Sequence, residues 1–595
     1  MINFTTRPEI QGTFGVVAST HWIASAVGMS ILERGGNAFD AAVATGFVLQ
    51  VLEPHLNGPA GDLPVLYRTP EREPKVLCAQ GPAPRAATLE AMRALDLELI
   101  PGSGLLATVV PGAFDGWLSL LRDHGTMELK EVLEPTIYYL LNGYPTLPAV
   151  SDAIAELLPF FKAHWPSSAE VWAPGDVVPQ PGSLMRNPDL ARTWQRICDL
   201  AVGKSREERI DAARSAWSDG FVADTIADWL KTAEVMDVTG RRHRAFLARE
   251  DLSQWRARVE EPLSVTYHGW TVYKTGPWGQ GPVLLQALQI LKNFDLSAMD
   301  PMGPQFVHTV VEAIKLAWAD REAYYGDPDF FDVPIAQLLA EDYGRERAKL
   351  IGEQASLDQR PGILPGYENL AEAVVTRAQR RIEVEDNPAT GEPTMAHLTD
   401  VRGDTVHLDI IDRHGNMVSA TPSGGWLQSN SIVPGLGFAL NSRAQMFWLD
   451  EGLASTLRPG ARPRTTLTPS LALHEDGRGL AFGTPGGDQQ DQWQLIWLLR
   501  FVHHGLNLQE GIDAPLFHSQ HFQASFFPRH ANPGRLMLEA SFPEETISGL
   551  RERGHEILVS PANTIGRLTA TLRHADGRLQ AAATPRLMQA YAIGR

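Results

Sequence analysis

A threonine at the start of a strand, Thr405, is the residue of this chain best suited to nucleophilic chemistry. Beyond it Val406, Leu408 and Ile410 alternate with other side chains, the period-two pattern of a half-buried strand. If the chain were cut before Thr405, that residue would carry a hydroxyl and a free α-amine. An α-amine has a pKa of roughly 8, so it can accept the hydroxyl proton at neutral pH. One residue would then supply both nucleophile and base.

Threonine alone does not establish catalysis, because it is common in strands for its β-propensity. Several longer motifs, in a fixed order, add to it. They are GGNAFDAAVA at 35–44, EAIKLAWADR at 312–321, TVHLDIIDRHGNMVS at 405–419, RPRTTLTP at 462–469 and GTPGG at 483–487. On these motifs the chain resembles the γ-glutamyltransferase family of N-terminal-nucleophile hydrolases over nearly its whole length.

The resemblance implies that the chain cuts itself at the bond between Asp404 and Thr405. It predicts a large subunit of 1–404, ending in a Pro/Gly-rich linker at about 354–404, and a small subunit of 405–595. The Thr405 hydroxyl would attack the Asp404 carbonyl, and the resulting ester would be hydrolysed. The same hydroxyl would later form acyl-enzymes with amide substrates. No cofactor is implied.

The resemblance also assigns residues around the nucleophile. Ser423 stands where the family has a second hydroxyl that orients the nucleophile, although a plain turn residue is an equal alternative. Gly486 and Gly487 stand where backbone N–H groups form the oxyanion hole. Thr465 and Thr466 replace a Ser-Ser pair that helps to hold the glutamyl α-carboxylate.

The departures from the family pattern bear on the substrate. Gln80 stands where the family has the arginine that clamps the α-carboxylate, and Gly425 replaces its glutamate-binding Asn. No carboxylate follows at Gln445 or Met446 to hold the α-amino group, whereas Arg443 is new. A neutral amide cannot supply a charged bidentate fork. We therefore expect an acyl group other than γ-glutamyl. Arg443 either binds an anionic or carbonyl group, or is a solvated surface residue or the partner in a structural ion pair.

Three functions are consistent with these residues. The leading prediction is a self-processing amidohydrolase or acylase that uses Thr405. The alternative is a γ-glutamyl hydrolase or transferase, acting on glutathione-like γ-glutamyl amides through a rebuilt pocket. The third is a catalytically silent binding relative, against which the intact Thr405, Ser423 and Gly486 argue.

Composition narrows the partners. The 595 residues carry a net charge of −18, which argues against nucleic acid and anionic membranes. The only two cysteines, Cys78 and Cys198, provide no disulfide framework. Because the first twelve residues lack the pattern of a signal peptide, we expect a cytoplasmic protein. Its partner would be a small-molecule amide, its two subunits would stay associated, and a homo-oligomer is left open.

Metal binding and aromatic residues near the motifs give weaker signals. His518 and His521 are spaced as a metal pair, but no nearby Asp, Glu or Cys completes a site, so no metal is expected. Asp488 is interpreted as a helix N-terminal residue. Trp426 and Trp448 either shape an acyl pocket or pack in the core.

The elements that would position these residues come from periodicity. Asn37 should cap an apolar, buried helix ending at Leu52, and 120–260 should be mostly helical. Residues 267–275 read as a strand and 283–293 as a helix. Strands should dominate from 405 to about 490, followed by helices near 492–515. The family resemblance implies the fold class, an α/β four-layer αββα sandwich in which both subunits form one interdigitated domain.

Overall fold

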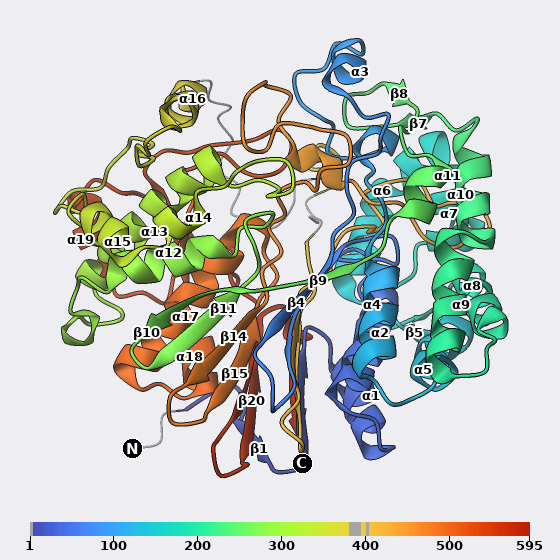
Figure 1. Cartoon of the computed structure of the whole chain (residues 1–595), viewed down its shortest axis with the longest axis horizontal. Helices are drawn as coiled ribbons and strands as arrows, with labels where there is room; N and C mark the ends of the chain where they lie inside the picture. Colours follow the sequence, from blue (N-terminus) through green and yellow to red (C-terminus); the bar gives the residue numbers. More distant parts are fainter. Residues whose placement is uncertain (1–3, 380–393, 400–403) are drawn as a thin grey trace.

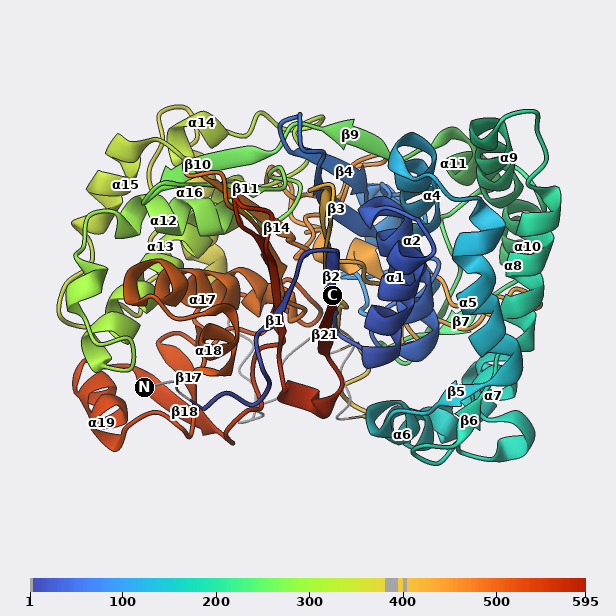
Figure 2. The ribbon, with the colours of Figure 1, turned by 90° about the horizontal axis from the view of Figure 1, so that it is seen from below.

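Two seven-stranded sheets stack against each other between layers of helices in the computed structural model (Figure 1). It describes residues 4–379, 394–399 and 404–595. Figure 2, turned by 90°, shows both sheets edge-on, with one group of helices on either side. The predicted αββα arrangement is confirmed.

The first sheet is antiparallel throughout and combines strands from both sides of Thr405. In spatial order its strands are β1 (Ile10–Gly12), β20 (Leu579–Ala583), β19 (Thr569–Arg573), β15 (Gly479–Gly483), β14 (Ser470–His474), β11 (Trp270–Lys274) and β10 (Leu263–Tyr267).

The second sheet is also antiparallel and holds the strand that follows Thr405. Its order is β21 (Tyr591–Gly594), β2 (Gly15–Ser19), β12 (Leu408–Asp412), β13 (Met417–Ala420), β3 (Leu63–Arg68), β4 (Lys75–Ala79) and β9 (Arg258–Glu260). In β12, Leu408 pairs with Ser19 on one side and with Ala420 on the other. The strand is therefore held centrally, between early and late segments of the chain.

Three apolar clusters fill the spaces between the four layers. Small and branched side chains such as Val16, Ile411, Leu471 and Ala581 pack between the two sheets. A second cluster joins the second sheet to α1 (Trp22–Glu33), α2 (Ala38–Leu52) and α4 (Ala113–His124). A third joins the first sheet to α12 (Pro282–Leu291), α13 (Pro304–Tyr324), α17 (Gln490–His504) and α18 (Leu508–Asp513).

The remaining helices lie outside this core. Beside α2 stand α5 (Leu129–Asn142), α6 (Pro148–His164), α7 (Pro166–Trp172), α8 (Pro188–Leu200), α9 (Arg206–Ser218), α10 (Phe221–Leu230) and α11 (Arg249–Gln254). Near α13 stand α14 (Ile335–Leu338), α15 (Glu341–Ala348), α16 (Glu368–Ala378) and α19 (Glu544–Glu552), and α3 (Leu89–Arg93) projects at the rim.

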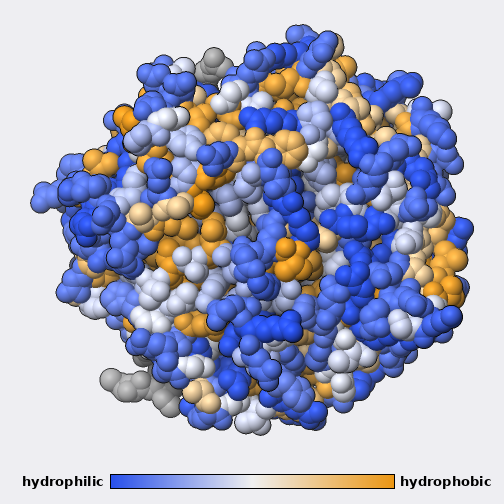
Figure 3. Space-filling view, viewed as in Figure 1, coloured by the Kyte–Doolittle hydropathy of each residue, from blue (hydrophilic) through white to orange (hydrophobic). Residues whose placement is uncertain are grey.

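Short strands complete the structure. β16 (Phe517–Ser519), β17 (Arg535–Glu539) and β18 (Glu556–Ser560) form a three-stranded sheet, and two pairs, β5 (Tyr144–Pro145) with β6 (Leu184–Met185) and β7 (Val235–Met236) with β8 (Arg242–His243), lie in the helical region. Hydrophilic side chains cover most of the face in Figure 3, which fits the strongly negative net charge. No described helix is both long and apolar enough to cross a bilayer.

Helix α2 shows how the sequence fixes the layer behind Thr405. Asn37 Oδ1 accepts the N–H groups of Phe39 and Asp40 at 2.9 and 3.1 Å, and Asp40 accepts the Asn37 N–H at 2.9 Å. This capping box satisfies N–H groups that would otherwise lack partners. Every residue of α2 is buried, as its apolar sequence predicts.

Three local predictions differ from the structure. Residues 267–275 are not one strand, because a turn at His268 and Gly269 separates β10 from β11. Between β13 and β14 the chain forms loops and isolated bridges instead of strands. In the predicted linker, 368–378 is helix α16 and Gly362 N–H donates to Asp320 of α13 at 2.7 Å. Part of the linker lies outside the described residues.

Candidate active site

Thr405 lies fully buried just before β12, where a single bridge joins it to Ser423. Val406 N–H donates to the Pro422 carbonyl at 3.1 Å, which fixes the backbone immediately after Thr405. Thr405 Oγ1 donates to Ser423 Oγ at 3.2 Å. The central strand thus presents the predicted nucleophile to the predicted second hydroxyl.

Ser423 is bonded to both sides of the bond predicted to be cut. Its Oγ donates to the Asp404 carbonyl oxygen at 2.8 Å while accepting from Thr405. Its backbone is fixed to Asp62, with Asp62 N–H donating to the Ser423 carbonyl at 2.9 Å and the reverse bond at 3.1 Å. The Ser423 hydroxyl therefore contacts groups on both sides of the predicted cleavage site.

The side chain of Asp404 is also buried, and the guanidinium of Arg567 donates to its carboxylate. Burial raises the pKa of Asp404, and Arg567 and the Gly486 N–H oppose that rise. Arg567 N–H donates to Thr484 Oγ1 at 3.1 Å. Arg567 therefore stands beside the loop that carries Gly486.

This loop, from β15 to the short helix η5 (Gly487–Gln489), requires its glycines. Gly486 has φ +132° and Gly487 has φ +56°, a region that favours glycine. A Cβ on Gly486 would lie 2.2 Å from the ring of Trp493. Gln280 Nε2 donates to the Gly487 carbonyl at 3.3 Å and supports the loop from the side.

Asp488 does more than the predicted helix N-terminal role, because it is the partner of a buried arginine. Arg321 of α13 donates to its carboxylate at 2.7 Å, and Ser525 donates through N–H at 2.7 Å and through Oγ at 2.6 Å. Glu322 follows Arg321 in the chain. Burial alone would raise the pKa of the Glu322 carboxyl, but the positive charges of Arg464 and Arg321 lower that pKa to about 2. An ionic network thus ties the loop of Gly486 and Gly487 to α13.

Arg443 forms an ion pair with Asp62 instead of lying in the solvent. Its Nε is 2.9 Å from Asp62 Oδ1, and both side chains are buried. Its guanidinium lies 5.0 Å from the ring centroid of Trp426, a cation–π contact. Burial raises the pKa of Asp62, and Arg443 opposes that rise. Because the backbone of Asp62 is hydrogen-bonded to that of Ser423, the ion pair lies next to the hydroxyls of Ser423 and Thr405.

The other predicted substrate residues are placed less directly. The Thr465 side chain is close enough to Asp62 to lower its pKa, whereas Gln80 donates to the Pro463 carbonyl. Thr466 Oγ1 has no hydrogen-bond partner within the described part of the chain. Gly425 has φ +68°, and its carbonyl packs against Gly58 so closely that a Cβ on Gly58 would not fit.

Sequence reasoning missed two charged residues near the predicted cleavage site. Arg567 gave no local signal, and Glu53, although part of a family-like stretch, was given no role. Glu53 accepts from Thr20 Oγ1 at 2.6 Å and from the Gln589 amide. Burial raises the pKa of Glu53 to about 7, and the Asp404 charge adds to that rise. A carboxyl that titrates near neutral pH therefore lies within electrostatic reach of the predicted cleavage site.

A cavity of about 530 Å³ lies beyond the loop that supports Asp488. Trp448, Pro528 and Arg529 line it, with the Arg529 guanidinium 4.2 Å from the Trp448 ring centroid. A Cβ on Gly487 would lie 3.2 Å from the Phe526 ring, so the 525–529 segment separates the cavity from the loop of Gly486 and Gly487. Trp448 therefore lines a cavity, whereas Trp426 is packing.

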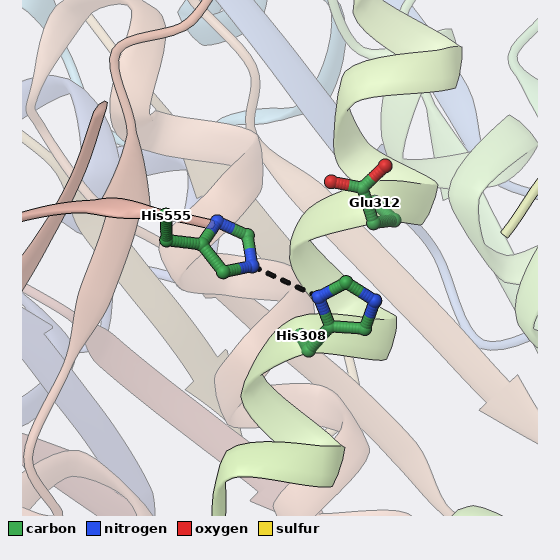
Figure 4. A group of neighbouring side chains, drawn as sticks. All are labelled: His308, Glu312 and His555. Atoms are coloured by element: carbon green, nitrogen blue, oxygen red, sulfur yellow. Dashed lines mark hydrogen bonds between the residues drawn. The ribbon is translucent and has the colours of Figure 1, made fainter. Parts of the chain in front are cut away.

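One group of described residues has the composition of a metal site. Ligand atoms of His308, Glu312 and His555 lie within 4.8 Å of one another (Figure 4). The two rings bond each other at 2.9 Å, and His308 Nε2 lies 2.9 Å from the Gly352 carbonyl. The Glu312 carboxylate is already neutralised by Lys315 at 2.6 Å and Arg360 at 2.7 Å. Two cations on the only carboxylate disfavour a third, so this is a structural polar cluster.

Comparisons with known proteins agree with this geometry. The sequence model for Gamma-glutamyltranspeptidase matches residues 24–594. The oxamate amidohydrolase proenzyme of Klebsiella pneumoniae is 30% identical over 585 residues, covering 96% of this chain and 97% of its own length. The crystal structure of cephalosporin acylase from Bacillus halodurans has 29% identity and a TM-score of 0.82, covering 100% of this chain and 98% of its own. A structure of LmbA2991HD has 47% identity and a TM-score of 0.91, covering 100% of both chains.

Proposed function

Because the chain belongs to the gamma-glutamyltranspeptidase family and is a self-processing amidohydrolase or acylase of that family, we propose that Thr405 is its nucleophile. One observation carries the proposal. Ser423 Oγ accepts from Thr405 Oγ1 at 3.2 Å and donates to the Asp404 carbonyl at 2.8 Å. One hydroxyl thus contacts both the attacking oxygen and the oxygen on which negative charge develops.

Self-cleavage follows from these contacts. Thr405 Oγ attacks the Asp404 carbonyl carbon, the new C–O bond forms, and the C–N bond to the Thr405 nitrogen breaks. Water then hydrolyses the ester, leaving a carboxylate on Asp404 and a free α-amine on Thr405. The products are chains of 1–404 and 405–595.

Substrate turnover uses the same Thr405 hydroxyl together with the free α-amine that cleavage has produced. The α-amine takes the Thr405 hydroxyl proton as the oxygen attacks a substrate amide, and passes it to the leaving amine. The N–H groups of Gly486 and Gly487 stabilise the oxyanion, a role that the close backbone approach at glycine permits. Water resolves the acyl-enzyme.

The acyl group in this proposal is not γ-glutamyl. Gln80 carries no charge and gives its amide N–H to the Pro463 carbonyl, and Arg443 is engaged by Asp62. Neither offers the free cation that an α-carboxylate needs. A γ-glutamyl hydrolase or transferase with a rebuilt pocket is the outcome that would replace this part of the proposal.

Intact mass tests the nucleophile. Wild type should give two chains of 404 and 191 residues, Thr405→Ala one chain, and the buried-strand control Thr571→Ala two chains. Wild type should then hydrolyse simple acyl p-nitroanilides faster than γ-glutamyl-p-nitroanilide. An uncut wild type, or a cut Thr405→Ala, would remove Thr405 from its role. A cytoplasmic location stays a prediction of the sequence, and the oligomeric state stays open.

A further inference from the structure

The residue before the nucleophile is an aspartate whose side chain occupies a prepared anion site. Asp404 is 1% exposed, and its carboxylate accepts from the Arg567 guanidinium. The Gly486 N–H and the Arg443 guanidinium also act on it, each lowering its pKa against the larger opposite effect of burial. A buried carboxylate needs such partners, because an isolated charge is costly to desolvate.

Arg567 differs from the other cations around Thr405 in the carboxylate with which it forms an ion pair. Arg443 pairs with Asp62, and Arg321 pairs with Asp488, both within parts of the chain that the proposed cut does not touch. In the described part of the chain, Arg567 forms its ion pair with Asp404. Once the bond after Asp404 breaks, that partner becomes a chain end, whereas Arg567 stays anchored to Thr484 at 3.1 Å.

Self-cleavage treats Asp404 as the acyl group. The carbonyl that Thr405 attacks is joined through Cα and Cβ to the carboxylate on Arg567, so the precursor displays a bound four-carbon acyl unit with a terminal carboxylate. An external acyl group of that length would place its own carboxylate on Arg567 when its carbonyl reaches Thr405.

We propose that Arg567 is the specificity-determining anion site of the mature enzyme, and that its substrates are monoamides of four-carbon dicarboxylic acids such as N-succinyl amines. This inference rests on the proposed role of Thr405. In the reaction, Thr405 Oγ bonds to the succinyl carbonyl, the C–N bond breaks, and the amine leaves with the hydroxyl proton. Water hydrolyses the ester to succinate and regenerates the hydroxyl.

The family relative that is an oxamate amidohydrolase is named for a substrate that carries a carboxylate beside its amide, which fits an anionic acyl class. Gln80 cannot serve that class as a cation. Arg567, beside the loop that carries Gly486, would thus bind the carboxylate of the substrate. The position of the family's usual arginine, here Gln80, would not.

The test compares acyl groups that differ in one feature. Mature wild type should hydrolyse N-succinyl-p-nitroanilide with a kcat/KM on the order of 10- to 100-fold above that of N-butyryl-p-nitroanilide, which lacks the carboxylate. Arg567→Gln should lose the preference mainly through KM, and Arg567→Lys should keep part of it. The control Arg578→Gln removes an arginine charge from an exposed pair and should leave the preference intact.

Because Arg567 touches Asp404, its variants could remain uncut, so a second measurement uses wild type alone. Succinate should inhibit turnover of a neutral acyl amide on the order of 10-fold more strongly than butyrate. If wild type cuts itself and hydrolyses succinyl and butyryl amides equally, with equal inhibition by the two acids, the Arg567 site is overturned and the proposed function stands. If wild type neither cuts itself nor hydrolyses any amide, both fall.

Discussion

The hydroxyl of Ser423 should control the rate of self-cleavage, and Ser423→Ala is the sharpest perturbation of it. The change removes the 2.8 Å bond to the Asp404 carbonyl and the acceptor for Thr405 Oγ1 at 3.2 Å. Because the backbone of Ser423 is held by two bonds to Asp62, we expect the strand geometry to persist without the side-chain oxygen.

The magnitude follows from where charge develops. In the resting chain a buried neutral hydrogen bond is worth about 1 kcal/mol. As Thr405 attacks, the Asp404 oxygen becomes an oxyanion, and losing one donor to such an oxygen typically slows the reaction by about 10²–10³, or roughly 3–4 kcal/mol. Ser423→Ala should therefore cleave itself at least about 100-fold more slowly than wild type.

The assay is a time course of intact mass after cell-free synthesis, which starts from uncut chains. Ser423→Thr keeps the hydroxyl and is the matched control, expected to cleave within roughly tenfold of wild type. Cleavage of Ser423→Ala within about threefold of wild type would refute the reasoning, because the hydroxyl would then contribute no more than an ordinary buried hydrogen bond.

Three further variants test the surroundings of the site. The first is Glu53→Gln, made in the uncleavable Thr405→Ala protein. The unfolded chain ionises Glu53 near pH 4.5 and the folded chain near pH 7, so the Glu53 parent loses stability as the pH rises between these values, whereas the Gln variant does not. In urea unfolding, the stability of Glu53→Gln relative to the parent should therefore increase by roughly 3 kcal/mol between pH 4.5 and 7. Asp488→Asn should destabilise the fold by about 3–5 kcal/mol in urea unfolding, since it leaves the buried cations Arg321 and Arg464 to share one carboxylate, that of Glu322. Gly486→Ala should slow self-cleavage at least about 100-fold by intact mass, because its Cβ would displace the oxyanion loop.

Each variant has a control. Glu53→Gln is compared at pH 5 and 7.5, and an unchanged stability difference would mean that Glu53 does not titrate there. Asp576→Asn breaks an exposed pair and should leave the stability nearly unchanged; an equally small loss for Asp488→Asn would contradict the ionic network. Gly435 also has a positive φ, +80°, but a Cβ there would meet open space, so Gly435→Ala should cleave normally.

The sequence predicted the local structure around Thr405 well because that information lies in neighbouring residues. The alternation after Thr405, the capping box of α2 and the GTPGG turn each depend on neighbouring residues, and the structure shows strand, helix and positive-φ turn there. The pairing of Thr405 with Ser423 also spans only 18 positions. The family motifs supplied the order of these parts and, with it, the αββα class.

The ion pairs could not be predicted, because they join residues that only the folded sheets bring together. Arg567 and Asp404 are 163 positions apart, and Arg443 and Asp62 are 381 apart. No periodicity links such positions. Strands were predicted to dominate from 405 to about 490, yet the stretch between β13 and β14 forms loops that carry Gly425 and Arg443 around the site. Tertiary burial there overrides strand propensity.

The pairing of the strands explains how a cut before Thr405 is compatible with an intact site. Strand β12, which follows the proposed cut, lies between β2 from the early segment and β13 from the late one. The first sheet likewise combines β10 and β11 with five strands, four of them from beyond residue 405. Cleavage would free Asp404 while Val406 stays bonded to Pro422, so the new N-terminus cannot drift from Ser423. The pairing of β12 with β2 and β13 thus holds the strand after Thr405 in place when that one peptide bond is lost.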